Sequence, residues 1–167
     1  VRRFMPELFD SEFDQMKRIA GELASNLVER LARDCQSTAD SEALTAQLQH
    51  FVRDYSFIQY AYVTDVKGHS TAIAISDPGD QKGYKAFPIG FDYSNREWFL
   101  QPMRTGKLHI TNVHQSQVTG QLIITVSTVI TDANDEIIGV LGAGIQLEEI
   151  NRRAESLEAE VPNSEEE

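Results

Sequence analysis

The spacing of apolar residues along this chain changes near residue 57, and this change limits the folds open to it. Before that point the apolar residues recur at steps of three and four, the period of one face of an α-helix. The first series comprises Phe9, Phe13, Met16, Ala20, Leu23, Leu27 and Leu31, and the second comprises Leu44, Leu48, Phe51 and Val52. The two series predict a long helix over about residues 11–34 and a second helix that begins near Asp40 and Ser41.

After this point the sequence favours β-strands. Residues 58–66 are rich in β-branched and aromatic side chains, and residues 71–75 alternate with a period of two. Together they predict a hairpin with its turn at Lys67 and Gly68. Residues 132–135 have the composition of a second hairpin turn. The three remaining predicted strands cover residues 108–113, 122–131 and 137–147.

A loop and a short helix are predicted between the second and third strands. Residues 77–88 contain two prolines and two glycines, a composition typical of a loop. Residues 92–105 predict a helix that ends at Gly106, and Pro102 rules out a long regular helix there. We expect this segment to cover one face of the sheet and to enclose a pocket.

This order of elements predicts a single α+β domain with a five-stranded antiparallel sheet, a long N-terminal helix and helices that flank the sheet. The two N-terminal helices are expected to cover one sheet face. Residues 1–150 form the predicted domain, and residues 151–167 are expected to complete a C-terminal helix and an acidic tail. The apolar seam of this closing helix consists of Leu147, Ile150, Ala154, Leu157 and Val161.

Composition and charge exclude several classes of function. The chain has 26 acidic and 15 basic residues and a formal net charge of −11, so it lacks the basic surface of a nucleic-acid-binding protein. Its single cysteine, Cys35, excludes an internal disulfide and a cysteine-based metal site, and we expect an inert thiol. His109 and His114 lack metal-ligand spacing, and the sequence has no catalytic or phosphate-binding motif. We therefore expect neither an enzyme nor a protein with a metal or cofactor.

One segment carries a specific family resemblance. Residues 92–99, DYSNREWF, resemble the signature of the Cache family of bacterial sensor domains, in which an Arg-x-Trp-aromatic segment lies over the sheet and faces the ligand. Residues 62–68, 116–127 and 139–142 resemble further landmarks of that family, in order and spacing, from about residue 9 to residue 150. The resemblance implies a PAS-like, profilin-like fold and a domain that binds a small molecule and signals through its terminal helices.

Ten residues are predicted to form the ligand site, from the resemblance and from the alternation of side chains along strands. They are Phe91, Tyr93, Arg96, Trp98, Phe99, Tyr60, Tyr62, His114, Thr125 and Ser127. The planar guanidinium of Arg96 fits a carboxylate, and aromatic walls strengthen such a contact by lowering the local dielectric. The alternative is that Arg96 is an ordinary exposed residue, that Trp98 only fills the core and that His114 is merely solvated.

Two positions depart from the pattern of the family's amino-acid-binding members. Phe91 stands where a tyrosine is expected, and Gly144 stands where the last strand has an aspartate that pairs with the ammonium group of the ligand. A buried ammonium group without a counter-charge is costly. The resemblance therefore implies a small anionic ligand, such as a short carboxylate, rather than an amino acid.

Other interpretations stay open from the sequence alone. The same PAS-like scaffold without a ligand would serve as a dimerisation or protein-interaction module. Apolar surface on the long helix and on the closing seam predicts a homodimer, and the alternative is that these stripes only cover the domain's own sheet. The family predicts an output signalling domain or partner protein. We expect a cytoplasmic protein if the chain is complete, and a periplasmic or extracytoplasmic one if it is part of a membrane receptor.

Overall fold

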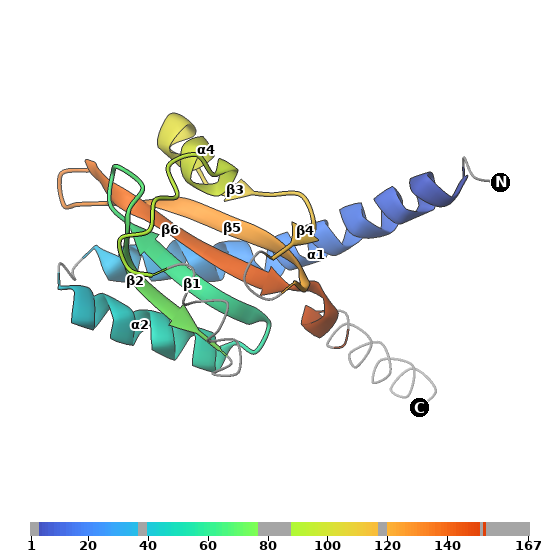
Figure 1. Ribbon diagram of the computed structural model, residues 1–167, viewed down its shortest axis with the longest axis horizontal. Coiled ribbons are helices and arrows are strands. Elements are labelled where there is room, and N and C mark those ends of the chain that lie inside the picture. Colours follow the sequence, from blue (N-terminus) through green and yellow to red (C-terminus); the bar gives the residue numbers. More distant parts are fainter. Residues whose placement is uncertain (1–3, 37–39, 77–87, 117–119, 151, 153–167) are drawn as a thin grey trace, which may run out of the picture.

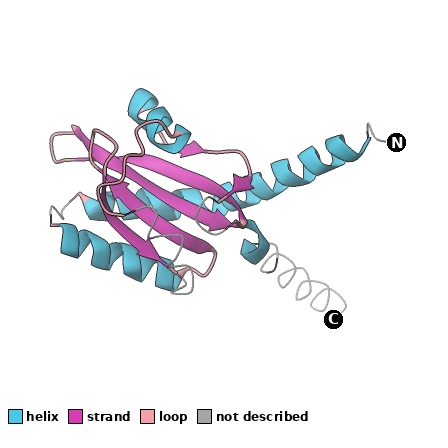
Figure 2. Ribbon diagram, viewed as in Figure 1, coloured by secondary structure: helices cyan, strands magenta, loops and turns pink. Residues whose placement is uncertain are grey.

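The computed structural model describes residues 4–36, 40–76, 88–116, 120–150 and 152, and it confirms the α+β fold (Figures 1 and 2). α1 begins at Phe4 rather than near residue 11, and α4 begins at Glu97 rather than at residue 92. The helices are α1 (Phe4–Cys35), α2 (Ser41–Asp54) and α4 (Glu97–Thr105). The strands are β1 (Ile58–Thr64), β2 (Ser70–Ile75), β3 (His109–Ile110), β4 (His114–Gln115), β5 (Leu122–Thr131) and β6 (Ile137–Gln146).

The strands form one antiparallel sheet in the order β2-β1-β6-β5-β3, and β4 also pairs with β5. β1 pairs with its hairpin partner β2 and with the last strand, β6. β5 and β6 pair along almost their whole length, from Ile123 opposite Gln146 to Thr131 opposite Ile137. β1, β5 and β6 are buried on both faces along most of their length, which explains their nearly continuous runs of apolar residues.

The third predicted strand, residues 108–113, is shortened to β3, and β4 follows beyond it, so the sheet has six strands in the described residues rather than the five expected. The pairing of this segment with β5 stops after Ile110, opposite Val126, and resumes at His114, opposite Ile123. The segment therefore advances by four residues where β5 advances by three. The extra residue makes a β-bulge. At the bulge, the backbone N–H of Thr111 donates to the carbonyl oxygen of Thr125 at 3.0 Å. The hydroxyl oxygen of Thr111 in turn accepts the backbone N–H of Thr125 at 2.9 Å.

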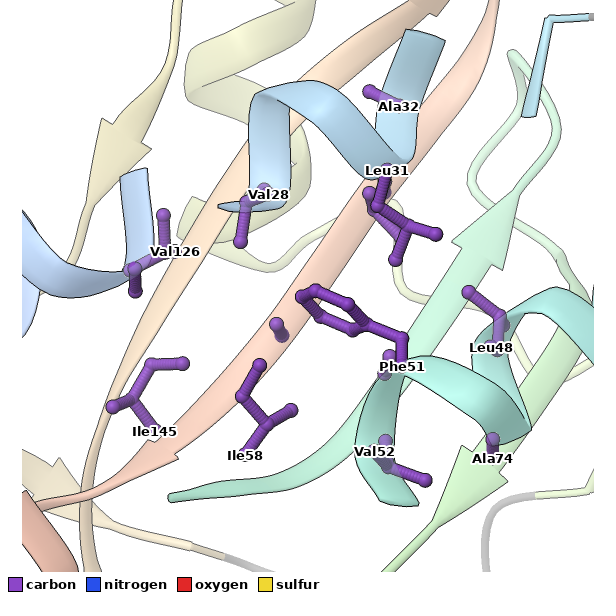
Figure 3. Packing of buried hydrophobic residues seen from close by; sticks show 14 of the residues in the cluster. Val28, Leu31, Ala32, Leu48, Phe51, Val52, Ile58, Ala74, Val126 and Ile145 are labelled. Carbon is purple, nitrogen blue, oxygen red and sulfur yellow. The ribbon is translucent and has the colours of Figure 1, made fainter. Parts of the chain in front are cut away.

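α1 and α2 cover the same face of the sheet, as predicted. α1 lies against β5 and β6, and α2 lies against β1 and β2. Figure 3 shows Val28 and Leu31 of α1 and Phe51 of α2 packed over the sheet, close to Ile58 and Ile145. This layer is the larger of the two hydrophobic cores, and burial of its apolar side chains drives the packing of the helices onto the sheet.

The buried stripe of α1 is rotated relative to the prediction. Leu23 is 47% exposed, and Ala24 and Val28 are fully buried instead. Small residues bring this part of the helix close to the sheet, and a Cβ at Gly21 would lie only 2.9 Å from Cδ1 of Ile110. Spacing alone favours the larger leucines, because it does not reveal that the helix lies close enough to exclude them. The first turns of α1 extend beyond the sheet (Figure 1).

The segment that contains α4 covers the opposite face of the sheet, again as predicted (Figure 1). Pro102 lies inside this short helix, so the carbonyl oxygen of Trp98 lacks its usual helical donor. The hydroxyl of Ser127 on β5 donates to that oxygen at 2.6 Å. α4 ends at Gly106, whose φ of 70° lies in the left-handed region and whose N–H donates to the Pro102 carbonyl at 2.7 Å.

The chain becomes helical again at Leu147, directly after β6. Leu147 and Ile150 are buried in the larger hydrophobic core, so this part of the predicted seam covers the domain's own sheet. The rest of the predicted seam and the acidic tail lie outside the described residues, as does most of the predicted loop at residues 77–88.

Candidate functional site

A cavity of about 460 Å³ lies between the sheet and the segment that covers it, and this volume is in the usual range for small-molecule sites. One side is aromatic and the other is polar. The aromatic side comes from β1 and from the residues around the start of α4, namely Tyr60, Tyr62, Tyr93, Arg96, Glu97 and Trp98. The polar side comes from the bulged segment and β5, namely Thr111, Asn112, Val113, His114, Gln115, Ser116 and Thr125.

Four aromatic rings form the apolar wall. The ring of Tyr62 stacks on Tyr93, with centroids 5.3 Å apart, and on Trp98, with centroids 5.5 Å apart. It also lies 4.9 Å from the ring of Tyr60. All four side chains are buried, and their mutual packing fixes the shape of the wall. A charged group bound beside this wall is shielded from water, which strengthens its contacts.

The tyrosine hydroxyls provide neutral hydrogen-bonding groups in this wall. Burial raises the pKa of Tyr93 to about 12, and the positive charge of Arg96 opposes this rise. Burial also raises the pKa of Tyr60, against the effect of hydrogen bonds to the side chains of Ser116 and Tyr62. Both phenols therefore keep their protons at neutral pH and add no negative charge to the wall.

Arg96 is the positively charged residue of the aromatic side. It occupies the N-cap position of α4 in an extended conformation, with φ −84° and ψ 141°, and its side chain is half-buried. The start of a helix carries a partial positive charge, which adds to that of the guanidinium. A guanidinium in such a setting can bind a carboxylate through two parallel hydrogen bonds.

Glu97 follows Arg96 and also lines the cavity, but its carboxylate is engaged by a neighbouring strand. Its Oε2 lies 2.7 Å from Nε2 of His109 on β3. The side chains of Glu97 and His109 are 58% and 26% exposed, so the pair contributes little to stability. It connects α4 to β3 and holds the carboxylate at β3.

The bulged segment supplies the polar wall. Residues 111–116 border the cavity, but their side chains divide between the two faces of the sheet. Val113 packs against the core under α1 and α2, and the amide oxygen of Asn112 accepts from Nζ of Lys17 on α1 at 2.9 Å. His114 pairs with Ile123, whose side chain belongs to the cavity face, so the imidazole lies on that face too. Nδ1 of His114 lies 2.9 Å from the carbonyl oxygen of Asn112 and 3.4 Å from Oγ1 of Thr111.

Two glycines of β6 allow the aromatic rings to lie directly on the sheet. A Cβ at Gly142 would lie 3.0 Å from Cε3 of Trp98, and a Cβ at Gly144 would lie 2.6 Å from Cζ of Tyr60. Aromatic rings that line the cavity therefore occupy both side-chain positions. A carboxylate at position 144 has no room while Tyr60 stays in place.

Seven of the ten predicted site residues line this cavity, and three do not. Phe91 packs against Tyr93, with ring centroids 4.9 Å apart. Phe99 is buried in the apolar cluster on this face of the sheet. Ser127 lies beneath Trp98 and holds its carbonyl oxygen. The residues that line the cavity are Tyr60, Tyr62, Tyr93, Arg96, Trp98, His114 and Thr125.

Six lining residues are absent from the predicted set. Five of them belong to the bulged segment, which was predicted as a strand only as far as residue 113. The run of polar residues after Ile110 is the only sequence signal for this wall, and no glycine or proline marks the bulge. The six residues are Glu97, Thr111, Asn112, Val113, Gln115 and Ser116.

Two features are not seen in the part of the chain that the structure describes: a metal site and a membrane-spanning helix. Within it, no group of three or more histidine, cysteine, aspartate or glutamate side chains is arranged to hold a metal ion. None of the helices described is long and apolar enough to cross a membrane.

This sheet, with helices on one face and a cavity beneath a covering segment on the other, defines a PAS-like sensor domain. The chain belongs to the Cache domain family, whose sequence profile matches residues 2–165. This match confirms the resemblance carried by residues 92–99. Cache domains are sensor domains rather than catalytic ones and are typically extracellular.

Solved chemoreceptor domains share the fold. The ligand-binding domain of the Pseudomonas fluorescens chemoreceptor CtaA, in complex with L-serine, is similar with a TM-score of 0.61 and 22% identity over 90% of this chain. That of the Campylobacter jejuni chemoreceptor Tlp3, in complex with 4-methylisoleucine, gives a TM-score of 0.63 and 16% identity over 83% of this chain. The matches cover 63% and 57% of those chains, so this chain spans about three fifths of them.

A curated protein is more similar in sequence. A protein of Syntrophus aciditrophicus named "Citrate (Re)-synthase" is 38% identical over 156 residues, which is 93% of this chain. The match covers only 25% of that protein, so the chain spans a quarter of its length.

Proposed function

We propose that this chain is the ligand-binding part of a signalling protein and that Arg96 anchors the carboxylate of a small anion in the cavity. The observation that carries the proposal is the half-buried guanidinium at the edge of a buried aromatic wall, at the start of a helix. Tyr60 and Tyr93 keep their hydroxyl protons, so the wall beside the guanidinium carries no negative charge. A charge-assisted hydrogen bond in such a site contributes about 1.5–3 kcal/mol, enough to select an anion.

The ligand in this proposal has no ammonium group. The related receptor structures hold amino acids or an amino-acid analogue, in which an ammonium group accompanies the carboxylate. In this chain the ring of Tyr60 fills the position at which an acidic side chain on β6 would meet that group. The carboxylate of Glu97 is at the cavity but is engaged by His109. An unpaired ammonium group would therefore lower the affinity.

A thermal-shift experiment with three matched compounds tests this function. Propionate, alanine and propylamine share a three-carbon skeleton and differ in the charged groups that they carry. We expect propionate to raise the melting temperature of the chain, alanine to raise it less and propylamine to leave it unchanged. Longer straight-chain acids up to hexanoate extend the series, because the cavity is larger than propionate.

Arg96→Ala should lose these shifts, and Arg104→Ala is the matched control. Arg104 lies in the last turn of the same helix, is exposed and does not line the cavity. A ligand present at about 100 times its dissociation constant stabilises the folded state by about 2.7 kcal/mol, so saturating binding is readily seen. Equal shifts in the two variants would contradict the role of Arg96.

A second candidate function is a ligand-free interaction module on the same scaffold. The observation that favours it is the pair Tyr60 and Gly144. The ring of Tyr60 occupies space that a ligand could use, and a glycine at position 144 offers no polar side chain to a ligand. This candidate predicts no thermal shift with any carboxylate. The same series of compounds therefore separates the two functions, and catalysis would be recognised by turnover of a bound compound.

We further propose that the domain acts on an output domain or partner protein through its terminal helices. The curated relative is about four times as long as the matched region, so a domain of this kind occurs there joined to further chain. The helical segment after β6 begins at Leu147, in contact with the larger hydrophobic core. In this proposal, binding in the cavity is passed to that segment through β6, which ends at Gln146 directly before it.

A homodimer through α1 is part of the same proposal. Leu23 is 47% exposed on this helix, and the first turns of α1 extend beyond the sheet. Leu147 and Ile150 do not contribute, because they are buried against the domain's own sheet. Sedimentation at high micromolar concentration tests this, and a monomer that persists there would exclude a dimer of the isolated chain.

A further inference from the structure

We propose that the ligand is a hydroxylated carboxylate, whose hydroxyl group donates a hydrogen bond to Nε2 of His114 while its carboxylate lies on Arg96. The inference rests on the proposed function, because it needs the carboxylate site. It goes further by assigning the chemistry of the second half of the ligand and the residue that recognises it.

The hydrogen bonds of His114 determine which ring nitrogen carries the proton. Nδ1 lies 2.9 Å from the backbone carbonyl oxygen of Asn112, and a carbonyl oxygen can only accept. In the neutral ring Nδ1 is therefore protonated and Nε2 carries the lone pair. Both contacts of the ring within the described residues use Nδ1, the second being with Thr111 at 3.4 Å. Nε2 is left as an acceptor.

The strand register places this acceptor on the cavity face. His114 pairs with Ile123, and Ile123 belongs to the same apolar cluster as Tyr60 and Trp98. His114 is itself one of the lining residues. Because a side chain on a paired strand points to the same face as its partner, the ring of His114 lies over the same cavity as Arg96.

The cavity favours a ligand that carries polar groups in addition to a carboxylate. Its volume of about 460 Å³ is several times that of a short unsubstituted acid. The polar side of the cavity includes His114, which is exposed. A hydroxylated chain can replace water at Nε2 of His114, which an alkyl chain cannot do.

The charges around the cavity favour a neutral donor over a charged one. Arg96 and Glu97 line the cavity together with His114, and Glu97 is held by His109. A ligand with a second carboxylate at His114 would place its negative charge against the lone pair of Nε2 in the neutral ring. Such a ligand could bind well only if a proton were taken up with it. An ammonium group could donate to Nε2 but would bring in a positive charge, and among the described residues that line the cavity the one carboxylate, that of Glu97, already contacts His109. A hydroxyl group donates without adding charge.

Calorimetric titration with pairs of acids tests the inference. Each straight-chain acid from propionate to hexanoate is compared with the acid of the same length that carries a terminal hydroxyl, at about pH 8, above the range in which histidines ordinarily titrate. We expect at least one hydroxylated acid to bind about three- to tenfold more tightly than its parent, the range for one neutral hydrogen bond.

Two variants of His114 and one control assign the effect. His114→Phe keeps a ring but removes the acceptor, and should abolish the preference without weakening the parent acid. His114→Gln supplies an amide oxygen and should retain part of the preference. His69→Phe alters a histidine of the β1–β2 turn outside the cavity lining and should change neither affinity.

Each other outcome overturns a defined part of the account. If the parent acids bind through Arg96 and no hydroxylated acid binds more tightly, the proposed function stands and the role of His114 is wrong. If a dicarboxylate binds more tightly than the hydroxy acid and takes up a proton, His114 acts as a cation instead. If the acid of the same length with a terminal amino group binds as tightly as the hydroxy acid, the proposed class of ligand is wrong.

Discussion

The ring of Tyr60 occupies the space into which a side chain at position 144 would project. The two residues face each other across the β1–β6 pairing, and a Cβ at Gly144 would lie 2.6 Å from Cζ and 2.7 Å from Cε2 of the ring. Glycine at this position lets the ring of Tyr60 form part of the aromatic wall of the cavity, with its hydroxyl 3.3 Å from Oγ of Ser116. The absence of an acidic side chain at position 144 and the presence of Tyr60 in the aromatic wall are therefore one structural feature.

Gly144→Ala should destabilise the fold, because the new methyl group and the Tyr60 ring cannot both keep their places. We expect a loss of about 1–3 kcal/mol in the free energy of unfolding, measured by urea denaturation. Gly142→Ala should cost less, since its Cβ would meet Trp98 at 3.0 Å. The double variant Gly144→Ala with Tyr60→Ala should be more stable than the sum of the two single losses implies. Additive losses would show that the two residues do not compete for space.

Ser127→Ala should destabilise the chain by removing the donor to the carbonyl oxygen of Trp98. That oxygen is buried and has no helical donor because Pro102 lacks an N–H. We expect a loss of about 1–3 kcal/mol in the free energy of unfolding.

The double-mutant cycle with Pro102→Ala isolates this hydrogen bond. Alanine at position 102 offers an N–H to the Trp98 carbonyl, so Ser127→Ala should cost less in that background. An equal cost with and without Pro102 would mean that the serine acts through something other than this bond.

Cys35 should react slowly with thiol reagents in the folded protein. Its side chain is 1% exposed, and burial, aided by the charge of Asp34, raises the pKa of the thiol from 9.0 to about 11. The nucleophilic thiolate is therefore scarce at about pH 8. We expect labelling by a disulfide reagent to require unfolding, and rapid labelling of the folded chain would contradict the burial of this thiol.

The same shift makes stability depend on alkaline pH. The folded state holds the thiol proton more tightly than the unfolded state, so this contribution is complete below about pH 9 and is lost as the pH rises towards about 11. Tyr60 and Tyr93 also have raised pKa values, so the comparison must be with Cys35→Ala. The wild type should lose more stability than the variant between these pH values, and parallel curves would contradict the shift.

The fold was predictable because each segment has a strong local pattern. The bounds of β5 match the apolar run at residues 122–131, and α2 matches its stripe of buried residues. The break between β3 and β4 could not be predicted, because the bulge depends on the hydroxyl of Thr111 bonding to the backbone of Thr125. The stripe of α1 was misplaced because close approach to the sheet favours alanines over leucines.

The candidate site was predictable where it lies on regular strands or in the signature segment. Alternation placed Tyr60 and Tyr62 on the cavity face, and the signature placed Arg96 there. Phe99 and Ser127 share a face with lining residues but do not border the cavity: Phe99 is buried where α4 packs on the sheet, and Ser127 bonds to the carbonyl oxygen of Trp98. Which residues of one face meet an opening depends on what covers that face, and the spacing of residues carries no such information.

Arg96→Ala should remove the carboxylate site with little loss of stability. The side chain is half-buried at a helix start, and truncating a functional arginine of this kind leaves the core untouched. We expect the melting temperature of the unliganded variant to stay close to that of the wild type. A large drop would mean that Arg96 chiefly holds the covering segment in place.

Isothermal titration calorimetry of the wild type and of Arg96→Ala, each with propionate and with alanine, tests the central claim most directly. The account predicts that the wild type binds propionate more tightly than alanine, by about tenfold if the unpaired ammonium group costs about 1.4 kcal/mol, and that Arg96→Ala binds neither. Tighter binding of alanine than of propionate, or an unchanged affinity for propionate in Arg96→Ala, would contradict it.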